Sequence, residues 1–163
     1  MPDKNNINQK ILYLVKLFNQ KKYDEVIKNS YELVKKEPRI VILYKLIGAS
    51  FAFKGDQIKA IEFYNKSLSL DLNDEEIYRN LGKSYIKIGK YDEAIKKFEK
   101  SVELKPINPD SFFSLGFIYL RKEKYLESLI NFKKTIELDK NQFEVYYNLG
   151  VIYDLIGNLN ESK

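Results

Sequence analysis

The side chains in this sequence of 163 residues that could do chemistry are carboxylates, amines and phenols, because histidine and cysteine are both absent. Without histidine the commonest general base is missing, and without cysteine there are no disulfides or thiolate metal sites. No glycine-rich loop of the phosphate-binding type occurs, and the carboxylates fall on polar faces. We therefore expect no enzyme, no cofactor and no metal site in this chain.

The chemistry that remains is binding through charge and apolar contact. The net charge is +5, and lysine supplies 25 of the 28 basic residues because only Arg39, Arg79 and Arg121 are arginine. Lysine-rich usage of this kind also follows from an AT-rich genome, so it does not by itself indicate a nucleic-acid surface. The longest apolar run near the N-terminus, Ile11 to Val15, is too short for a signal peptide or a membrane span, which favours a cytoplasmic protein.

The elements that must position these groups repeat at a fixed interval. Glycine recurs every 34 residues at four positions, and small residues, aromatic residues and leucines keep the same interval. A period of 20 to 50 residues is typical of stacked-repeat proteins, and the apolar positions within one period follow helical spacing. The main series are Gly48, Gly82, Gly116, Gly150; Ala60, Ala94, Ser128, Ser162; Tyr44, Tyr78, Phe112, Tyr146; Phe51, Tyr85, Tyr119, Tyr153; and Tyr64, Phe98, Phe132.

A second set of positions predicts the turns. Gly55, Gly89 and Gly157 each follow a glycine of the first series by seven residues, and Glu123 takes the equivalent place in the fourth repeat. Glycine favours a turn between two helices, and Pro106 marks the end of the second helix of its pair.

The segment "EIYRNLGKSYIKIGKYDEAIKKFEKSVELKP", which ends at Pro106, resembles a tetratricopeptide repeat. This resemblance implies an all-α fold, a right-handed superhelix (α-solenoid) of antiparallel helix pairs. We expect a short N-terminal tail (1–6) and a single domain (7–163) with repeats 7–40, 41–74, 75–108, 109–142 and a partial repeat 143–163. The net charges of the five repeats, in chain order, are +4, 0, +2, +1 and −2.

The first repeat departs from the pattern. Leu14 replaces the glycine, Val26 replaces the alanine and Lys10 replaces the aromatic residue, as expected of an end repeat with no preceding neighbour. In the other repeats, small residues let two helices approach closely. We expect Gly82 to face Ala94, and Ser101 to lie against the first helix of the next repeat.

The resemblance also implies a binding surface, because the first helix of each pair lines the concave groove of this family. Eleven of the thirteen tyrosines, all but Tyr31 and Tyr147, fall at positions that pack helices together. Phe53 falls on the concave positions, and Phe113, Phe117 and Tyr147 are aromatic there without being required for packing. The expected partner-binding residues are Lys45, Arg79, Asn80, Lys83, Lys87, Phe113, Phe117, Arg121, Tyr147 and Asn148.

This combination predicts a scaffold or adaptor that holds a protein or peptide partner with apolar anchors and acidic flanks. One subclass of the family binds a C-terminal carboxylate, but Ala49, Asp110 and Ser114 stand where three of its five polar residues should be. An RNA-binding helical-repeat protein is an alternative, although a basic stripe is expected for it and the charge here is mixed. No membrane partner is expected.

Assembly is a further alternative. A helix is expected at about 144–156, followed by a turn at Gly157 and the start of a second helix. In that arrangement Leu149, Ile152 and Tyr153 have no helix to cover them, so we expect either that the chain is a piece of a longer array of repeats or that its C-terminal end packs against another copy.

Overall fold

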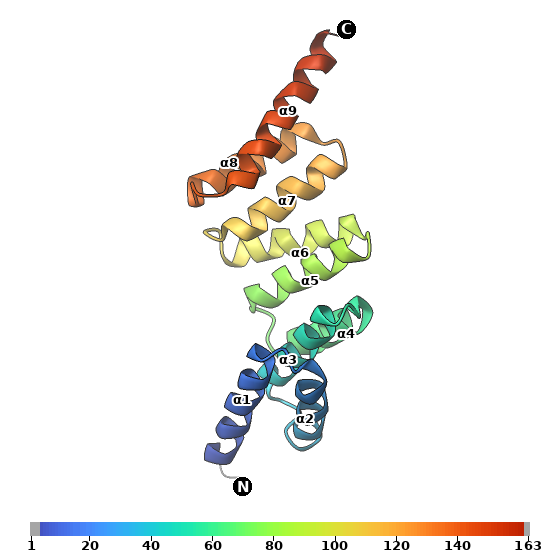
Figure 1. The fold of residues 1–163 in the computed structure, drawn as a ribbon, viewed down its shortest axis with the longest axis vertical. Helices are drawn as coiled ribbons and strands as arrows, with labels where there is room; N and C mark the ends of the chain where they lie inside the picture. Colours follow the sequence, from blue (N-terminus) through green and yellow to red (C-terminus); the bar gives the residue numbers. More distant parts are fainter. Residues whose placement is uncertain (1–3, 162–163) are drawn as a thin grey trace. The chain divides into compact units, whose positions relative to one another are not determined.

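The structure, a computed structural model, describes residues 4–161, and the described residues form helices joined by short connections (Figure 1). No strand occurs among them, which confirms the all-α helical-repeat fold. The helices are α1 (Lys4–Asn19), α2 (Tyr23–Lys36), α3 (Val41–Phe53), α4 (Gln57–Leu68), α5 (Glu75–Lys87), α6 (Tyr91–Leu104), α7 (Pro109–Arg121), α8 (Tyr125–Leu138) and α9 (Phe143–Glu161).

The chain divides into two compact units, Met1–Lys90 and Tyr91–Lys163. In unit 1 each helix from α1 to α5 packs against the next, and α3 also contacts α1 and α5. In unit 2 the same succession runs from α6 to α9. Contacts between neighbouring helices along the chain are typical of stacked repeats, in which each pair buries its apolar side against the next pair.

The connections inside the helix pairs share one geometry. Lys21, Gly55, Gly89 and Glu123, which are 34 residues apart, all have positive φ, between 58° and 89°. The following residue donates its backbone N–H to the carbonyl five residues earlier, as from Asp56 to Phe51 at 3.0 Å. This is the hydrogen bond of a Schellman helix end, which a residue in the left-handed region makes possible. The predicted turns at Gly55, Gly89 and Glu123 are therefore confirmed.

Two glycines of the main series are in close contact with an aromatic ring. A Cβ atom at Gly48 would lie 2.7 Å from the ring of Tyr64, and a Cβ at Gly116 would lie 2.7 Å from the ring of Phe132. The hydroxyl of Ser128 also donates to the carbonyl of Gly116 at 2.7 Å. These glycines therefore leave the space that a large side chain of the paired helix fills.

A hydrogen bond between repeats confirms the expected place of Ser101. Its Oγ lies 2.7 Å from Oγ of Ser111 on α7, the first helix of the next repeat, and both side chains are buried. The contact expected between Gly82 and Ala94 stays a prediction.

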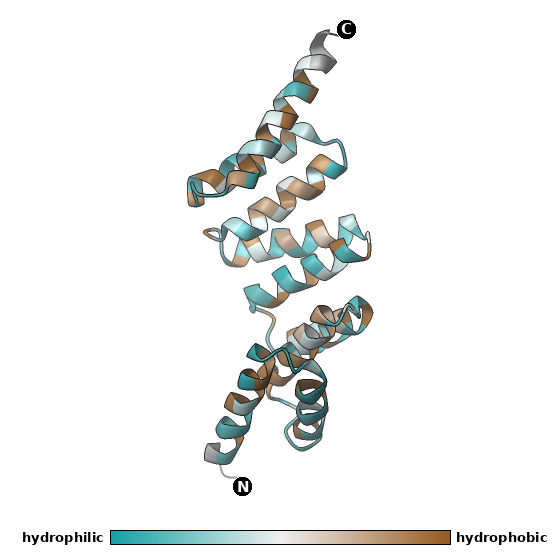
Figure 2. Ribbon diagram, viewed as in Figure 1, coloured by the Kyte–Doolittle hydropathy of each residue, from teal (hydrophilic) through white to brown (hydrophobic). Residues whose placement is uncertain are grey.

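Apolar side chains form separate clusters in each unit. Unit 1 holds one cluster around Leu14, Leu17 and Leu43 and another around Tyr64 and Ile77. In unit 2, Phe132, Val145 and Ile152 form the buried centre of a cluster that joins α7, α8 and α9. In Figure 2 the middle of α7 is white to brown, as expected for a helix with packed neighbours on two sides.

The C-terminal helix differs from the expectation. No turn forms at Gly157, and α9 continues as one helix to Glu161. The turn at Gly55 is followed by α4, which packs back against α3, and no helix packs back in this way on α9 among the described residues. Ser162 lies outside the described residues.

Two details of packing were also predicted wrongly. Leu149 and Ile152 are not left uncovered, because they pack in the cluster of unit 2. Tyr13 and Tyr146, which the spacing predicts to pack between helices, are about half exposed, whereas Tyr153 is about half exposed as expected for a residue that no following helix covers. The reason is that α1 and α9 each have neighbouring helices on one side only among the described residues.

None of the described helices is long and apolar enough to cross a membrane.

Candidate functional site

A surface pocket of about 290 Å³ in unit 1 brings together three of the predicted binding residues. We call it the α3–α5 pocket, because residues of α3, α4 and α5 line it. The lining residues are Ala52, Phe53, Gln57, Tyr64, Asn80, Lys83, Ser84 and Lys87.

The α5 residues reach the pocket because of their helical spacing. Asn80, Lys83 and Lys87 are three and four residues apart, so they lie along one side of the helix. The helix begins at Asp74, whose carboxylate accepts a hydrogen bond from the backbone N–H of Ile77 at 3.3 Å. This N-cap fixes where α5 starts and therefore which side chains face α3.

The apolar part of the pocket is held by aromatic contacts. The ring of Phe53, largely exposed, stacks on Tyr23 with the centroids 5.4 Å apart and meets the edge of Phe18 at 5.6 Å. Behind it, burial first and then the charge of Glu76 raise the pKa of Tyr64, so this phenol stays neutral. Gln57 donates its side-chain amide to the carbonyl of Ala52 at 3.0 Å, which closes the turn beside the pocket.

The polar part of the pocket carries positive charge. The side chains of Lys83 and Lys87 are exposed and form no ion pair within the part of the chain that the structure describes. Asn80 is half-buried beside them and can both donate and accept hydrogen bonds. The pocket therefore combines an apolar floor with two ammonium groups and one amide.

Two other predicted residues are engaged within the protein. Lys45 lies 2.9 Å from a carboxylate oxygen of Asp74 and 2.7 Å from one of Glu76. Burial acts to lower the pKa of Lys45, but the hydrogen bonds and charges of Glu76 and Asp74 outweigh it and raise that pKa. The carboxylates thus hold Lys45 as a cation that joins α3 to the start of α5.

Arg79 is held in a similar way. Its Nε donates to a carboxylate oxygen of Glu75 at 3.3 Å on the same helix, and both side chains are largely buried. Neither Lys45 nor Arg79 is among the residues that line the α3–α5 pocket.

The other five predicted residues lie in unit 2. Phe113 and Phe117 on α7 are half-buried and pack against the apolar cluster, so they contribute to the core as well as to the surface. The guanidinium of Arg121 lies over the Phe117 ring at 5.3 Å. On α9, Tyr147 is highly exposed and Asn148 donates its amide to the carbonyl of Glu144 at 2.9 Å.

Sequence reasoning missed the contribution of the second helix to the pocket. Phe53 was placed on the concave positions, but Gln57 and Tyr64 of α4 and the buried Ser84 of α5 were not. Tyr64 follows the packing pattern of its series, and no signal in the sequence shows that one edge of its ring also faces a pocket.

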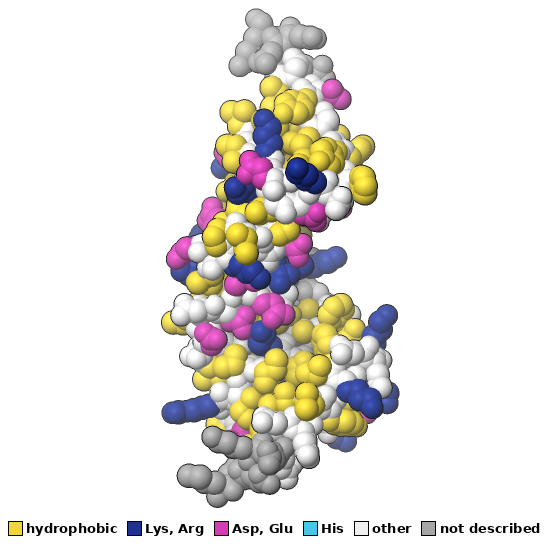
Figure 3. All heavy atoms as spheres, turned by 90° about the vertical axis from the view of Figure 1, so that its left-hand side faces the viewer, with side chains coloured by type: hydrophobic (Ala, Val, Ile, Leu, Met, Phe, Trp, Pro, Cys, Tyr) yellow, Lys and Arg dark blue, Asp and Glu magenta, His cyan; other side chains and the backbone are white. Residues whose placement is uncertain are grey.

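Charges of both signs are interspersed on the face shown in Figure 3, where hydrophobic side chains gather in patches between them. Within the described part of the chain, no group of three or more histidine, cysteine or acidic residues could hold a metal ion. The arrangement can bind through charge and apolar contact, and the pocket contains no acid–base pair.

Sequence models of one family match three parts of the chain. Models described as "TPR repeat" and "Tetratricopeptide repeat" match residues 82–123, 131–163 and 43–74. No curated protein sequence gives a significant match.

Solved structures of similar fold cover most of the chain. A crystal structure of MamA is 23% identical with a TM-score of 0.83, over 87% of this chain and 83% of that one. YrrB, described as a TPR protein with an unusual peptide-binding site, is 19% identical with a TM-score of 0.80, over 91% and 77%. The first TPR of Spaghetti (RPAP3), bound to the HSP90 peptide SRMEEVD, is 20% identical with a TM-score of 0.69, over 72% and 93%. At these identities the likeness shows the fold.

Proposed function

Because this chain belongs to the tetratricopeptide repeat family, we propose that it is a protein-interaction scaffold and that it binds an extended segment of a partner protein. The observation that carries the proposal is the α3–α5 pocket, where Phe53 and Tyr64 meet two lysines with no ion pair among the described residues. YrrB is described as having a peptide-binding site, and the first TPR of Spaghetti (RPAP3) is bound to a peptide, which supports this class of function.

The chemistry of the pocket defines the segment that fits. Its apolar floor suits an aliphatic or aromatic side chain, and the ammonium groups of Lys83 and Lys87 suit a carboxylate one or two residues away. The Asn80 amide can bond to a peptide backbone group, which adds no preference for a particular side chain. We infer an extended peptide with an apolar anchor and an acidic neighbour.

Binding of a C-terminal carboxylate in the way of the chaperone-binding subclass is not supported. By the resemblance, Lys45 and Asn80 occupy the other two of the five polar positions of that subclass, and Lys45 is paired with Asp74 and Glu76. Binding there would require the lysine to leave both carboxylates. The peptide that we propose needs no free C-terminus.

RNA binding is the less supported alternative. Arg79, with its side chain largely buried against Glu75, and Lys45 are both engaged with carboxylates. Because these two cations are paired with carboxylates, their charge is not available to bind the phosphates of an RNA backbone. The interspersed signs in Figure 3 do not favour a phosphate-binding surface either. As in the sequence analysis, catalysis, a cofactor and a membrane partner form no part of the proposed function, and the location that we propose is cytoplasmic.

Self-association is a second candidate role, and one observation favours it. A Cβ atom at Gly150 on α9 would have no neighbour within 4 Å, whereas the equivalent Gly48 and Gly116 are each covered by a ring. At Gly150, α9 therefore exposes a surface that a ring of the paired helix covers at Gly48 and Gly116.

The peptide site is tested by selecting peptides from a displayed random library against the chain and measuring the winners by titration calorimetry. We expect selected peptides to share an apolar residue beside Asp or Glu. Phe53→Ala and the double variant Lys83→Glu/Lys87→Glu should each weaken binding roughly tenfold or more. The control Lys28→Glu/Lys105→Glu changes the net charge equally at exposed positions and should bind as the wild type does. Peptides whose affinity is unchanged by the pocket variants would place the site elsewhere.

A further inference from the structure

One side of α9 carries aromatic side chains that the described residues leave uncovered. Phe143 is 82% exposed and Tyr147 is 74% exposed, and Tyr146 and Tyr153 are about half exposed. At about 100° per residue, these positions and the residues between them on the same side fall within a sector of about 120°. We call this sector the α9 stripe, and it consists of Phe143, Tyr146, Tyr147, Gly150, Tyr153, Asp154 and Gly157.

The middle of the α9 stripe is a depression. Neither Gly150 nor Gly157 has an atom within 4 Å of where its Cβ would lie. At Gly48 and Gly116, which are equivalent to Gly150, the same space holds the ring of Tyr64 or Phe132. The α9 stripe is therefore shaped to receive apolar side chains, and it is flanked by aromatic rings that would be buried with them.

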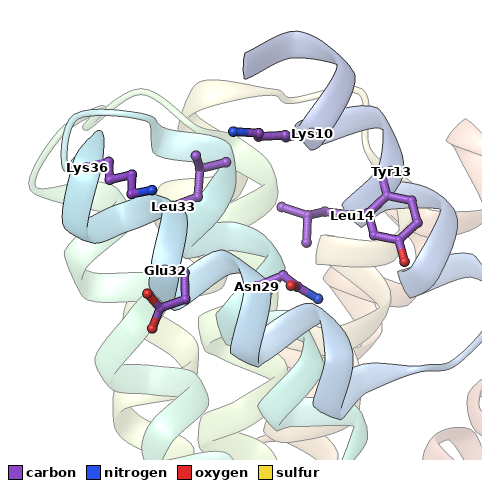
Figure 4. Close-up of a pocket in the computed structure, with 7 residues that line it drawn as sticks. All are labelled: Lys10, Tyr13, Leu14, Asn29, Glu32, Leu33 and Lys36. Atoms are coloured by element: carbon purple, nitrogen blue, oxygen red, sulfur yellow. The ribbon is translucent and has the colours of Figure 1, made fainter. Parts of the chain in front are cut away.

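A matching surface lies at the other end of the chain. A pocket of about 230 Å³ opens between α1 and α2, and we call it the α1–α2 pocket (Figure 4). Leu14 and Leu33 point toward the space between the helices, and the amino groups of Lys10 and Lys36 extend toward it from opposite sides. On α1, Tyr13 also lines the pocket and is 54% exposed.

The first repeat has Lys10 where the later repeats have an aromatic residue. In the second repeat the hydroxyl of Tyr44, at the equivalent position, donates to the carbonyl of Pro38 in the connection before α3 at 2.8 Å. The equivalent bond runs from Tyr146 to Lys140 at 3.3 Å. A surface pocket also lies at the equivalent place of the fourth repeat, beside Phe112, and Lys10 gives the pocket of the first repeat an ammonium group that Phe112 does not supply.

The two surfaces have opposite charge. From Phe143 to Gly157, α9 contains Glu144 and Asp154 and no basic residue, while repeat 7–40 has a net charge of +4. Lys10 and Lys36 form no ion pair within the described part of the chain, and the one carboxylate that lines the pocket, Glu32, pairs with Lys35 at 2.9 Å. An acidic aromatic helix therefore suits the α1–α2 pocket, and a second copy of this chain presents one.

We propose that the α9 stripe of one copy docks against the α1–α2 pocket of a second copy. The proposal rests on the self-association candidate and is independent of peptide binding in the α3–α5 pocket. An aromatic ring of the α9 stripe enters between Leu14 and Leu33, and Asp154, the acidic residue of the stripe, faces Lys10 and Lys36. Because the two surfaces are different, a single contact between two copies leaves the α1–α2 pocket free on one copy and the α9 stripe free on the other. Further copies dock at these free surfaces, so assembly continues head to tail beyond a dimer.

Sedimentation equilibrium of the full chain over a wide concentration range tests this assembly. We expect the average mass to rise past that of a dimer with concentration, and to fall again when salt is added. The donor variant Asp154→Lys and the acceptor variant Lys10→Glu/Lys36→Glu should each lower the association constant roughly tenfold or more. The variant that carries all three changes should associate again, because the charges are exchanged and still opposite.

The control is Ile58→Lys, which charges an equally exposed apolar residue of α4 outside both surfaces and should assemble like the wild type. A wild-type chain that stays monomeric at every concentration would overturn self-association altogether. Loss of assembly in the donor variant alone would keep α9 as an interface but remove the α1–α2 pocket as its acceptor. A mass that stops at a dimer would overturn the head-to-tail arrangement. None of these results bears on peptide affinity, which calorimetry measures separately.

Discussion

At the scale of single residues, the positive φ angles show how a repeat tolerates different side chains at one backbone position. Gly55 and Gly89 adopt φ of 89° and 74°, and Lys21 and Glu123 adopt 60° and 58° at equivalent places. A side chain in this region is strained by the contact of its Cβ with the backbone, whereas glycine is not. The fold imposes the same turn on all four residues because the two helices on either side must pack.

This strain gives a prediction for Glu123→Gly. We expect the free energy of unfolding to rise by roughly 0.5–1 kcal/mol, since relief of the left-handed backbone outweighs the added freedom of the unfolded chain. Urea unfolding followed by circular dichroism measures this free energy. The control is Glu127→Gly in the first turn of α8, which should lower the free energy of unfolding because glycine is unfavourable within a helix. A Glu123→Gly protein that is less stable than the wild type would contradict the explanation.

At the scale of helix pairs, the first repeat exchanges a large and a small residue. Gly48 faces Tyr64 in the second repeat, whereas the equivalent positions of the first repeat hold Leu14 and Ser30. Both of these side chains are buried, and the hydroxyl of Ser30 has no hydrogen-bond partner among the described residues. The volume between the helices is therefore filled from α1 in the first repeat and from α4 in the second.

The exchange predicts a strong coupling between the two positions. Leu14→Gly alone should cost about 2–5 kcal/mol by leaving a cavity, and Ser30→Tyr alone should cost about 1–3 kcal/mol by overpacking. The double variant should be more stable than the sum of the two losses predicts, by roughly 0.5–3 kcal/mol. A double-mutant cycle, with each variant unfolded in urea, measures this coupling energy. If the two losses of stability simply add, the two side chains do not share one space.

At the scale of the whole molecule, stability is divided along the chain. Repeats contact mainly their neighbours, so a local change should be felt locally rather than throughout the protein. Unit 1 and unit 2 each contain buried clusters of their own, so we expect each unit to have a stability of its own.

Overpacking one glycine at a time tests this division. In Gly48→Leu the new side chain meets the Tyr64 ring in unit 1, and in Gly116→Leu it meets the Phe132 ring in unit 2. We expect each to cost about 1–3 kcal/mol. Hydrogen exchange followed by mass spectrometry should show faster exchange in α3 and α4 for the first variant and in α7 and α8 for the second. An equal acceleration in every helix for either variant would show one cooperative unit instead.

The regular spacing of the chain made the helices and turns predictable, because each depends on local contacts. The turns at Gly55 and Gly89 follow from backbone freedom, and helical spacing placed Asn80, Lys83 and Lys87 on one side of α5. The binding residues were predicted less well, because their availability depends on contacts between helices and not on local spacing. A repeat pattern shows which side of a helix a residue occupies, but it does not show which charged groups of other helices lie within reach.

The sequence by itself determined the all-α repeat fold, the interval of 34 residues and the lack of histidine and cysteine chemistry. The tertiary structure decided which basic residues are available, because Asp74 and Glu76 approach Lys45 only when α5 packs beside α3. It also decided that α9 continues through Gly157 and leaves its aromatic side uncovered. Local conformation follows from neighbouring residues, whereas charge pairing and exposure depend on groups brought together from distant parts of the chain.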